Sequence, residues 1–270
     1  MARKAAIITG SATGVGAATA RMLAEKGWNV AINYTKSQKE AGEVAAACQK
    51  LGADTIVVQA DVASDADCRR LVDEAVKKFG RLDAVVNSAG TTKFVNHRDL
   101  DGLSAEDFAR IFAVNATGPY LMARAAAPHL KKAGKAAIVN VSSLGGLRGS
   151  GSSIAYGASK AALNALTISL GRVLGPEIRV NAVCPAFIQG RWLKDNLGDE
   201  LYEQMKKQAE ANNPLKMAPT PEDVAAHICW LIEGAHLMTG QIISIDAGQS
   251  IAGPTGHTPP KKAEAAAAAR

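Results

Sequence analysis

The chain has 270 residues, of which 47% are hydrophobic, and its formal net charge is +6 with a sequence pI of about 9.1. This apolar content is enough for one large core, and no apolar run approaches the roughly 18 residues of a membrane span. The basic residues are spread along the chain instead of forming a stripe with aromatic residues between them, which argues against nucleic-acid binding and leaves anionic small ligands as candidates.

Targeting and metal binding are also constrained by the sequence. The first predicted strand starts by about residue 4, which leaves no room for a signal peptide, so we expect a cytoplasmic protein. The four cysteines are widely scattered and form no C-x-x-C pair, and the five histidines are dispersed as well. We therefore predict buried, inert thiols, no disulfide framework and no metal site.

Segments typical of strands alternate with helical patterns long enough to be crossovers. This order predicts an α/β protein with a doubly wound parallel sheet, a Rossmann fold, in a single domain over residues 1–252. Residues 187–215 form a long insertion that could act as a lid, and residues 253–270 carry three prolines and five consecutive alanines, which predicts a flexible tail. The predicted strands are residues 4–9, 29–33, 55–59, 83–86, 136–141, 178–183 and 241–245.

The first strand runs directly into a glycine-rich loop and then a helical segment. Glycines at three positions let the backbone turn tightly and approach a ligand, while amides at the start of the helix supply donors for a pyrophosphate. A merely flexible turn is the alternative. The loop predicts a dinucleotide site at Gly10, Ser11, Thr13, Gly14, Val15 and Gly16.

The end of the second strand bears on the choice of cofactor. An acidic residue there usually binds the adenosine ribose and would repel a 2′-phosphate. This chain has Tyr34, Thr35 and Lys36 instead. We therefore favour NADP(H), with NAD(H) as the alternative, since Lys36 could be only a solvated loop residue and Thr13 is neutral.

Tyr156 and Lys160 lie four residues apart in a helical pattern, so both side chains fall on one face. A phenol beside an ammonium can transfer protons, because a nearby positive charge favours the ionised phenol and lowers its pKa. An isolated pair of this kind is usually coincidental. Here it accompanies other polar and glycine residues that follow predicted strand ends and should converge on one crevice.

The ordered motifs resemble those of the short-chain dehydrogenases/reductases over roughly residues 4–250, particularly members that reduce 3-oxoacyl thioesters. The resemblance rests on Thr9-Gly10-x-x-x-Gly14-x-Gly16, Asn87-Ser88-Ala89-Gly90, Asn115, Ser143 and Tyr156-x-x-x-Lys160. It implies Tyr156 as the acid/base, Ser143 holding the substrate oxygen, Lys160 lowering the tyrosine pKa and binding the nicotinamide ribose, and Asn115 positioning a water.

The resemblance extends the cofactor site. It implies contacts from Asp61, Val62, Asn87, Ala89, Gly90, Tyr156, Lys160, Pro185 and Ile188. Asp61 could instead cap a helix. Three departures stand out: Ala186 and Ala247 replace usual glycines, and Gly190 occupies the place of a threonine that binds the nicotinamide carboxamide. The Ile188 amide is a candidate replacement for that contact.

We expect NADPH-dependent reduction of a ketone or 3-oxoacyl carbonyl to a secondary alcohol, in a homotetramer formed by the helices near residues 107–132 and 156–174. The alternatives are NAD-dependent oxidation of a secondary alcohol, steroid or sugar, and a dinucleotide-binding scaffold with weak or no catalysis. Phe187, Trp192, Leu193, Leu197 and Tyr202 could line an apolar substrate cavity, although their spacing equally suits ordinary helix packing.

Overall fold

The computed structural model describes residues 3–252, so the expected tail at residues 253–270 lies outside the described part. Seven parallel strands form one sheet in the order β3-β2-β1-β4-β5-β6-β7, which confirms the predicted fold class. Each strand end lies within two residues of the prediction. The strands are β1 (Ala5–Thr9), β2 (Asn29–Tyr34), β3 (Thr55–Gln59), β4 (Ala84–Asn87), β5 (Ala136–Val141), β6 (Ile178–Pro185) and β7 (Ile242–Ile245).

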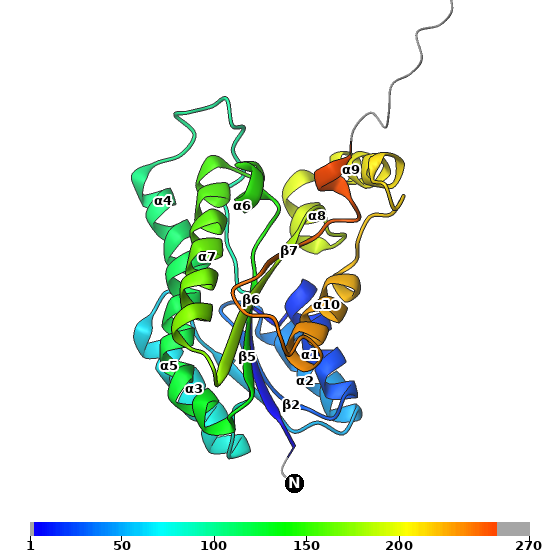
Figure 1. The fold of residues 1–270 in the computed structure, drawn as a ribbon. Coiled ribbons are helices and arrows are strands. Elements are labelled where there is room, and N and C mark those ends of the chain that lie inside the picture. Colours follow the sequence, from blue (N-terminus) through cyan, green and yellow to red (C-terminus); the bar gives the residue numbers. More distant parts are fainter. Residues whose placement is uncertain (1–2, 253–270) are drawn as a thin grey trace, which may run out of the picture.

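Helices cover both faces of the sheet (Figure 1). On one face lie α1 (Gly14–Glu25), α2 (Gln38–Lys50) and α10 (Pro221–Glu233). On the other lie α3 (Asp65–Phe79), α4 (Ala105–Phe112), a π-helical turn at Ala113–Thr117, α5 (Gly118–Ala133) and α7 (Ile154–Val173). Short α6 (Gly145–Arg148), α8 (Arg191–Leu197), α9 (Asp199–Asn212) and a 3-10 turn at Gln249–Ile251 complete the fold. Within residues 3–252, no helix combines the length and apolar character needed to cross a membrane.

Alternate residues of the central strands supply two separate cores. Ile8 and Val86 join the core beneath α1 and α10, whereas Ile7 and Val85 join the core beneath α3 and α5. Successive side chains of a strand point to opposite faces, so a continuous apolar run of this kind fits a sheet covered on both sides. All four cysteines are buried and unpaired, as expected from their spacing.

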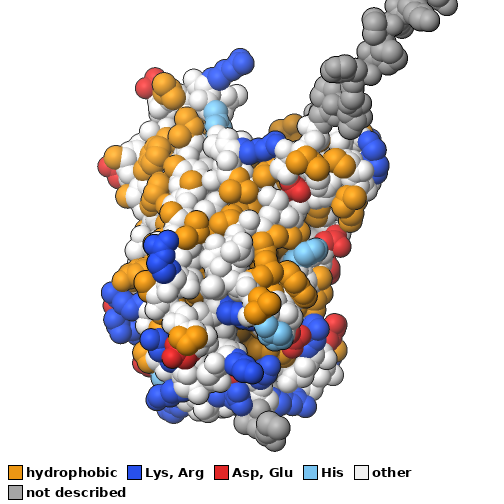
Figure 2. Space-filling model, in the orientation of Figure 1, with side chains coloured by type: hydrophobic (Ala, Val, Ile, Leu, Met, Phe, Trp, Pro, Cys, Tyr) orange, Lys and Arg blue, Asp and Glu red, His pale blue; other side chains and the backbone are white. Residues whose placement is uncertain are grey.

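The sheet brings its functional loops together at the carboxyl ends of the strands. In the sheet, β2 and β3 lie on one side of β1, and β4 lies on the other side. The strand order therefore reverses between β1 and β4, and a crevice is expected between the segments that follow these two strands. Thr9 pairs with Asn87 at this edge. Figure 2 shows one face of the molecule, where Lys and Arg side chains form separate groups, mostly toward the end opposite α8 and α9.

Candidate functional site

The glycine loop is tightly packed where it touches protein and open where a ligand would lie. A Cβ at Gly10 would come within 2.7 Å of Cα of Ala89, and one at Gly16 within 2.6 Å of the Gly10 carbonyl oxygen. Gly14, at φ +57°, has no atom within 4 Å of that position. Helix α1 begins after Thr13 without a side-chain cap or an acidic residue in its first turn. Its first amides are therefore suited to phosphate oxygens.

Buried polar side chains hold this loop in place. Asn33, at 1% exposure, accepts a hydrogen bond from the Gly10 amide (3.1 Å) and donates one to the Ala60 carbonyl (3.0 Å). The Ser11 hydroxyl donates to the Ile8 carbonyl (2.7 Å) and accepts from the Asn33 amide (3.0 Å). Ser11 is fully buried, so its side chain shapes the loop. Asn33 was not among the predicted site residues, although an asparagine in a buried strand indicates that its side chain has polar partners.

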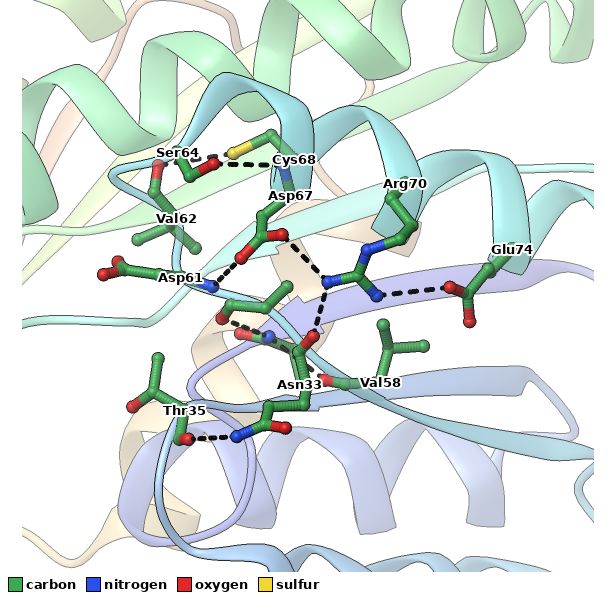
Figure 3. Close-up of polar contacts among 12 residues, drawn as sticks. Asn33, Thr35, Val58, Asp61, Val62, Ser64, Asp67, Cys68, Arg70 and Glu74 are labelled. Atoms are coloured by element: carbon green, nitrogen blue, oxygen red, sulfur yellow. Dashed lines mark hydrogen bonds and ion pairs between the residues drawn. The ribbon is translucent and has the colours of Figure 1, made fainter.

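A polar network fixes Asp61 in the segment that follows β3 (Figure 3). Asp67 accepts a hydrogen bond from the Asp61 amide (2.8 Å), while the Asp61 carboxylate accepts one from the Ala63 amide (3.0 Å) and pairs with Arg110 (2.9 Å). The cap of α3 is Ser64, whose hydroxyl accepts from the Asp67 amide. The alternative interpretation of Asp61 as a helix cap was therefore wrong.

Three residues at the end of β2 differ in what they offer to a ligand. Thr35 and Lys36 are exposed, whereas the Tyr34 ring packs into the core beneath α1 and is 9% exposed. Val62 is also buried, against Gly118, where an added Cβ would come within 2.9 Å of its methyl carbon. Of the side chains predicted here, Thr35 and Lys36 are the accessible ones. The nearest carboxylate along the chain is Glu40, which pairs with Arg191 at 3.3 Å.

The segment after β4 connects the glycine loop to α7. The Thr9 hydroxyl accepts from the amides of Ser88 and Ala89, each at 3.1 Å. Asn87 donates to the Asn140 side chain at 2.8 Å. Gly90 is exposed, and a Cβ there would lie 3.8 Å from the Lys160 ammonium.

Asn115 holds two segments together through its side chain. Its amide oxygen accepts from the Thr91 amide (2.8 Å), and its amide nitrogen donates to the Thr91 carbonyl (2.9 Å) and the Ser159 hydroxyl (3.0 Å). These contacts use both of its donor hydrogens. Asn115 is buried within the π-helical turn, a feature often found at functional sites. A water relay here would thus depend on the main chain of the turn.

Tyr156, Lys160 and Ser143 come together between β5 and α7. Tyr156 is 9% and Lys160 4% exposed, and the Lys160 ammonium donates to the Val141 carbonyl at 2.8 Å. The Ser142 hydroxyl donates to the Lys160 carbonyl (3.2 Å), which is a structural role. Ser143, instead, is a hydrogen-bond partner that lowers the pKa of Tyr156, and its hydroxyl accepts from the Gly145 amide (3.0 Å). This favours Ser143 over Ser142 as the functional serine.

The expected lowering of the Tyr156 pKa by Lys160 is not what this structure gives. Burial raises the pKa of Tyr156 to about 12, and the Ser143 contact only partly opposes the rise. Burial also lowers the pKa of Lys160 to about 8. Both shifts have one cause: each charged form loses hydration in a closed site. The phenol consequently keeps its proton at neutral pH.

The segment at residues 187–215 folds as α8 and α9 beside this site. Phe187 and Tyr202 pack against each other with ring centroids 5.8 Å apart, in a small core with Ala209, Ala218 and Leu193. Packing is therefore the role of these rings. Trp192 instead faces the site, with its ring centroid 5.9 Å from that of Tyr156.

Comparisons with known proteins agree with this geometry. The family model described as enoyl-(acyl carrier protein) reductase matches residues 10–250. A crystal structure described as a short-chain dehydrogenase/reductase from Burkholderia xenovorans superposes with a TM-score of 0.86 at 39% identity, covering 93% of this chain and 99% of that one. The chain belongs to the short-chain dehydrogenase/reductase family.

Curated relatives of this oxidoreductase carry ketoreductase names. A protein named as ketoacyl reductase 2 of the granaticin polyketide synthase, from Streptomyces violaceoruber, is 37% identical over 90% of this chain and 94% of its own length. The 3-oxoacyl-[acyl-carrier-protein] reductase FabG of Staphylococcus aureus is 34% identical over 91% and 97%, respectively. The chain is therefore an enzyme of the oxidoreductase class, similar to carbonyl reductases.

At two departures from the family pattern, Gly190 and Ala247, the backbone has a positive φ. Gly190 has φ +149°, with its amide donating to the Tyr202 hydroxyl (3.2 Å), and a threonine would be strained at this φ. Ala247 has φ +52°, in the left-handed region that a glycine adopts without cost. Ala186 is partly buried after Pro185, the last residue of β6, and Ile188 packs against the core beneath α1.

Among residues 3–252, no cluster of His, Cys, Asp or Glu is arranged to hold a metal ion.

Proposed function

We propose that this protein reduces a ketone or 3-oxoacyl carbonyl to a secondary alcohol, with NADPH as hydride donor and Tyr156 as proton donor. The observation that carries the proposal is the grouping of Tyr156, Ser143 and Lys160 at the carboxyl edge of the sheet, with the Lys160 ammonium 5.7 Å from the centre of the Tyr156 ring. A phenol can donate the proton that the carbonyl oxygen requires, and the nearby ammonium stabilises the phenolate that remains. The names of the ketoreductase relatives support the same reaction.

Each side chain of the site has a defined task in this reaction. The bound nicotinamide supplies the hydride. Ser143 and Tyr156 bind the carbonyl oxygen, so that Tyr156 can pass its proton to the oxygen as negative charge develops there. The resulting phenolate lies near the Lys160 ammonium, which stabilises the negative charge. Asn115 keeps the Thr91 segment and α7 in register through its hydrogen bonds to Thr91 and Ser159.

The preference for NADPH rests on the residues after β2. Lys36 is exposed and takes part in no ion pair among the described residues, so it is available to a 2′-phosphate. The first main-chain amides of α1, which no side chain caps, and the open space at Gly14 suit the pyrophosphate. Asp61 retains carboxylate lone pairs for the adenine amino group beyond its contacts with Ala63 and Arg110.

A cytoplasmic homotetramer is part of the proposal. A groove of about 490 Å³ runs over α5 and α7, the helices expected to associate, and both apolar side chains and the charged Arg124 and Lys131 line it. Ala123 and Ala127, which also line it, are small enough to allow close helix contact. Light scattering of the purified protein should give four times the mass of the 28.0 kDa chain; a monomer would overturn this part.

The test is a titration of the purified protein with NADPH and NADH by fluorescence, followed by rate measurements with linear 3-oxoacyl thioesters and simple ketones. We expect NADPH to bind at least about tenfold more tightly, a difference that one added ion pair at a desolvated phosphate can supply. The family description names an enoyl reduction, so a 2-enoyl thioester is included as a competitor substrate. Oxidation of alcohols with NAD as the faster reaction, or binding of neither cofactor, would contradict the proposal.

A further inference from the structure

Two neighbouring residues at the start of α8 make contacts on opposite sides of the crevice. Arg191 pairs at 3.3 Å with Glu40 in the first turn of α2, across 151 positions of the sequence. The Trp192 ring packs on the rings of Tyr156, on α7, and Phe94, in the segment after β4, with centroids 5.9 Å apart in both pairs. The first turn of α8 therefore joins the α2 side of the crevice to the α7 side.

The ion pair crosses the start of α1. Helix α1 contacts both α2 and α10 on one face of the sheet, and so lies between them (Figure 1). The chain before α8 is fixed on the α10 side, because Gln189 donates from its amide to the Pro219 carbonyl (2.8 Å) and from its side chain to the Ala218 carbonyl (2.7 Å). To reach Glu40 from there, Arg191 crosses the uncapped end of α1, whose first amides are suited to a pyrophosphate.

Residues 190–192, which we call the strap, are held by accessible contacts and follow a flexible joint. Gly190 has φ +149° and no atom within 4 Å of the position of a Cβ. None of the seven residues of α8 is buried. The side chains of Arg191 and Glu40 are 60% and 32% exposed, and ion pairs this accessible are weak. Segments with so few buried contacts open more readily than the rest of a fold.

We propose that the strap is a gate on cofactor exchange: its ion pair with α2 and its aromatic contact with α7 must break before a nicotinamide dinucleotide can enter or leave the crevice. This inference rests on the dinucleotide binding of the proposed function and goes beyond it, because it concerns the rate of exchange and not the reaction. Since the contacts of the strap join protein to protein, breaking them should speed entry and exit by the same factor and leave the dissociation constant nearly unchanged.

Two substitutions that change the charge in opposite directions test the gate. Glu40→Gln and Arg191→Gln each break the ion pair, and each should raise both the association and the dissociation rate of NADPH about two- to fivefold, the contribution of an accessible ion pair. NADH should respond in the same way. Stopped-flow mixing, followed by the fluorescence of the cofactor, gives both rates. The matched control is Glu43→Gln, because Glu43 is also exposed on α2 but pairs with Lys39 at 4.0 Å, and this variant should exchange cofactor like the wild type.

The direction of each effect separates a gate from a direct contact with the cofactor. If Arg191 bound a cofactor phosphate, Arg191→Gln should weaken NADPH binding and Glu40→Gln should strengthen it, because the two variants change the local charge oppositely. That pattern, or rates equal to those of the wild type in both variants, overturns the gate. The charge swap that combines Glu40→Arg with Arg191→Glu restores the pair and should return both rates to near those of the wild type.

The aromatic contact of the strap has its own test. Trp192→Ala should raise both rates about tenfold by removing the ring contacts, whereas Trp230→Ala should not, since Trp230 is 49% exposed, like Trp192 at 47%, but lies on α10. Exchange at the wild-type rate in Trp192→Ala overturns the gate. Faster exchange in the strap variants together with no ketone reduction would support the gate and contradict only the proposed reaction. A wild type that binds neither cofactor would contradict both.

Discussion

The Lys160 ammonium lies 5.7 Å from the centre of the Tyr156 ring and donates its hydrogen bond to the Val141 carbonyl at 2.8 Å. Lys160 is therefore a buried cation whose direct partner is a main-chain oxygen, and burial lowers its pKa to about 8 from the ordinary 10.5. The charge that would stabilise a phenolate in the proposed reaction therefore destabilises the folded protein in its absence.

This cost makes stability depend on pH in a defined direction. Between pH 8 and 10.5 the unfolded chain binds the Lys160 proton and the folded chain releases it, so this residue's contribution to stability increases as the pH rises. Burial raises the pKa of all four cysteine thiols, and they act in the opposite direction. The measurable quantity is thus the difference between wild type and Lys160→Met. We expect that difference in unfolding free energy to move by about 1 kcal/mol in favour of the wild type between pH 7.5 and 9.

Urea unfolding at these two pH values checks the prediction. Exposed Lys50 supplies the control, since Lys50→Met should change stability equally at both. A constant difference between wild type and Lys160→Met would mean that Lys160 keeps an ordinary pKa in the folded protein.

Removing the Tyr156 hydroxyl should abolish reduction. Tyr156→Phe leaves the ring contact with Trp192 possible but removes the proton donor, and we expect the rate to fall by roughly 10²–10⁴. The dissociation constant for NADPH should change less than about threefold, because the substitution keeps charge and volume. Tyr120→Phe is the control, because the Tyr120 side chain is exposed on α5. Substantial turnover by Tyr156→Phe would remove Tyr156 from its assigned role.

The fold was predictable because its signals are local and repeated. Continuous apolar runs such as β1 alternate with helical segments, and that order specifies a parallel sheet with strand ends on one edge. The family resemblance implied Ser143, which is the serine that contacts Tyr156, whereas Ser142 bonds the Lys160 carbonyl. These features depend on neighbours in the sequence and on topology.

Properties that depend on packing were not predictable in this way. The pKa shifts of Tyr156 and Lys160 arise from burial by segments distant in the sequence, so the helical pair alone suggested the opposite direction for Tyr156. Phe187 lies in a local core and Trp192 lies against Tyr156, and this difference depends on how the segment at residues 187–215 packs in three dimensions. Asn115 likewise shows its partners only in three dimensions.

Cofactor preference should depend on Lys36. Lys36→Ala removes the exposed ammonium after β2, and we expect NADPH binding to weaken about tenfold while NADH binding stays within about twofold. Lys39→Ala is a matched control, because Lys39 is also exposed and lies three residues further along, with its nearest acid, Glu43, 4.0 Å away. Fluorescence titration of both variants with both cofactors gives the four constants. Equal weakening of NADPH and NADH would indicate that Lys36 does not bind the 2′-phosphate.

The turn at Ala247 and Gly248 gives two substitutions with opposite expected effects. Ala247 adopts φ +52°, which costs an alanine about 1 kcal/mol relative to glycine, so Ala247→Gly should raise the unfolding free energy by up to about 1 kcal/mol. Part of that gain is offset by the greater freedom of glycine in the unfolded chain.

Gly248 has φ +85°, and a Cβ there would lie 2.7 Å from Cγ of Pro214, so Gly248→Ala should destabilise the protein by more than 1 kcal/mol. Because the Leu215 amide donates a hydrogen bond to the Ala247 carbonyl at 3.1 Å, the turn also anchors the end of the segment at residues 187–215. Thermal unfolding of the two variants should bracket the wild type, and a lower melting temperature for Ala247→Gly would show that the turn is not strained by its alanine.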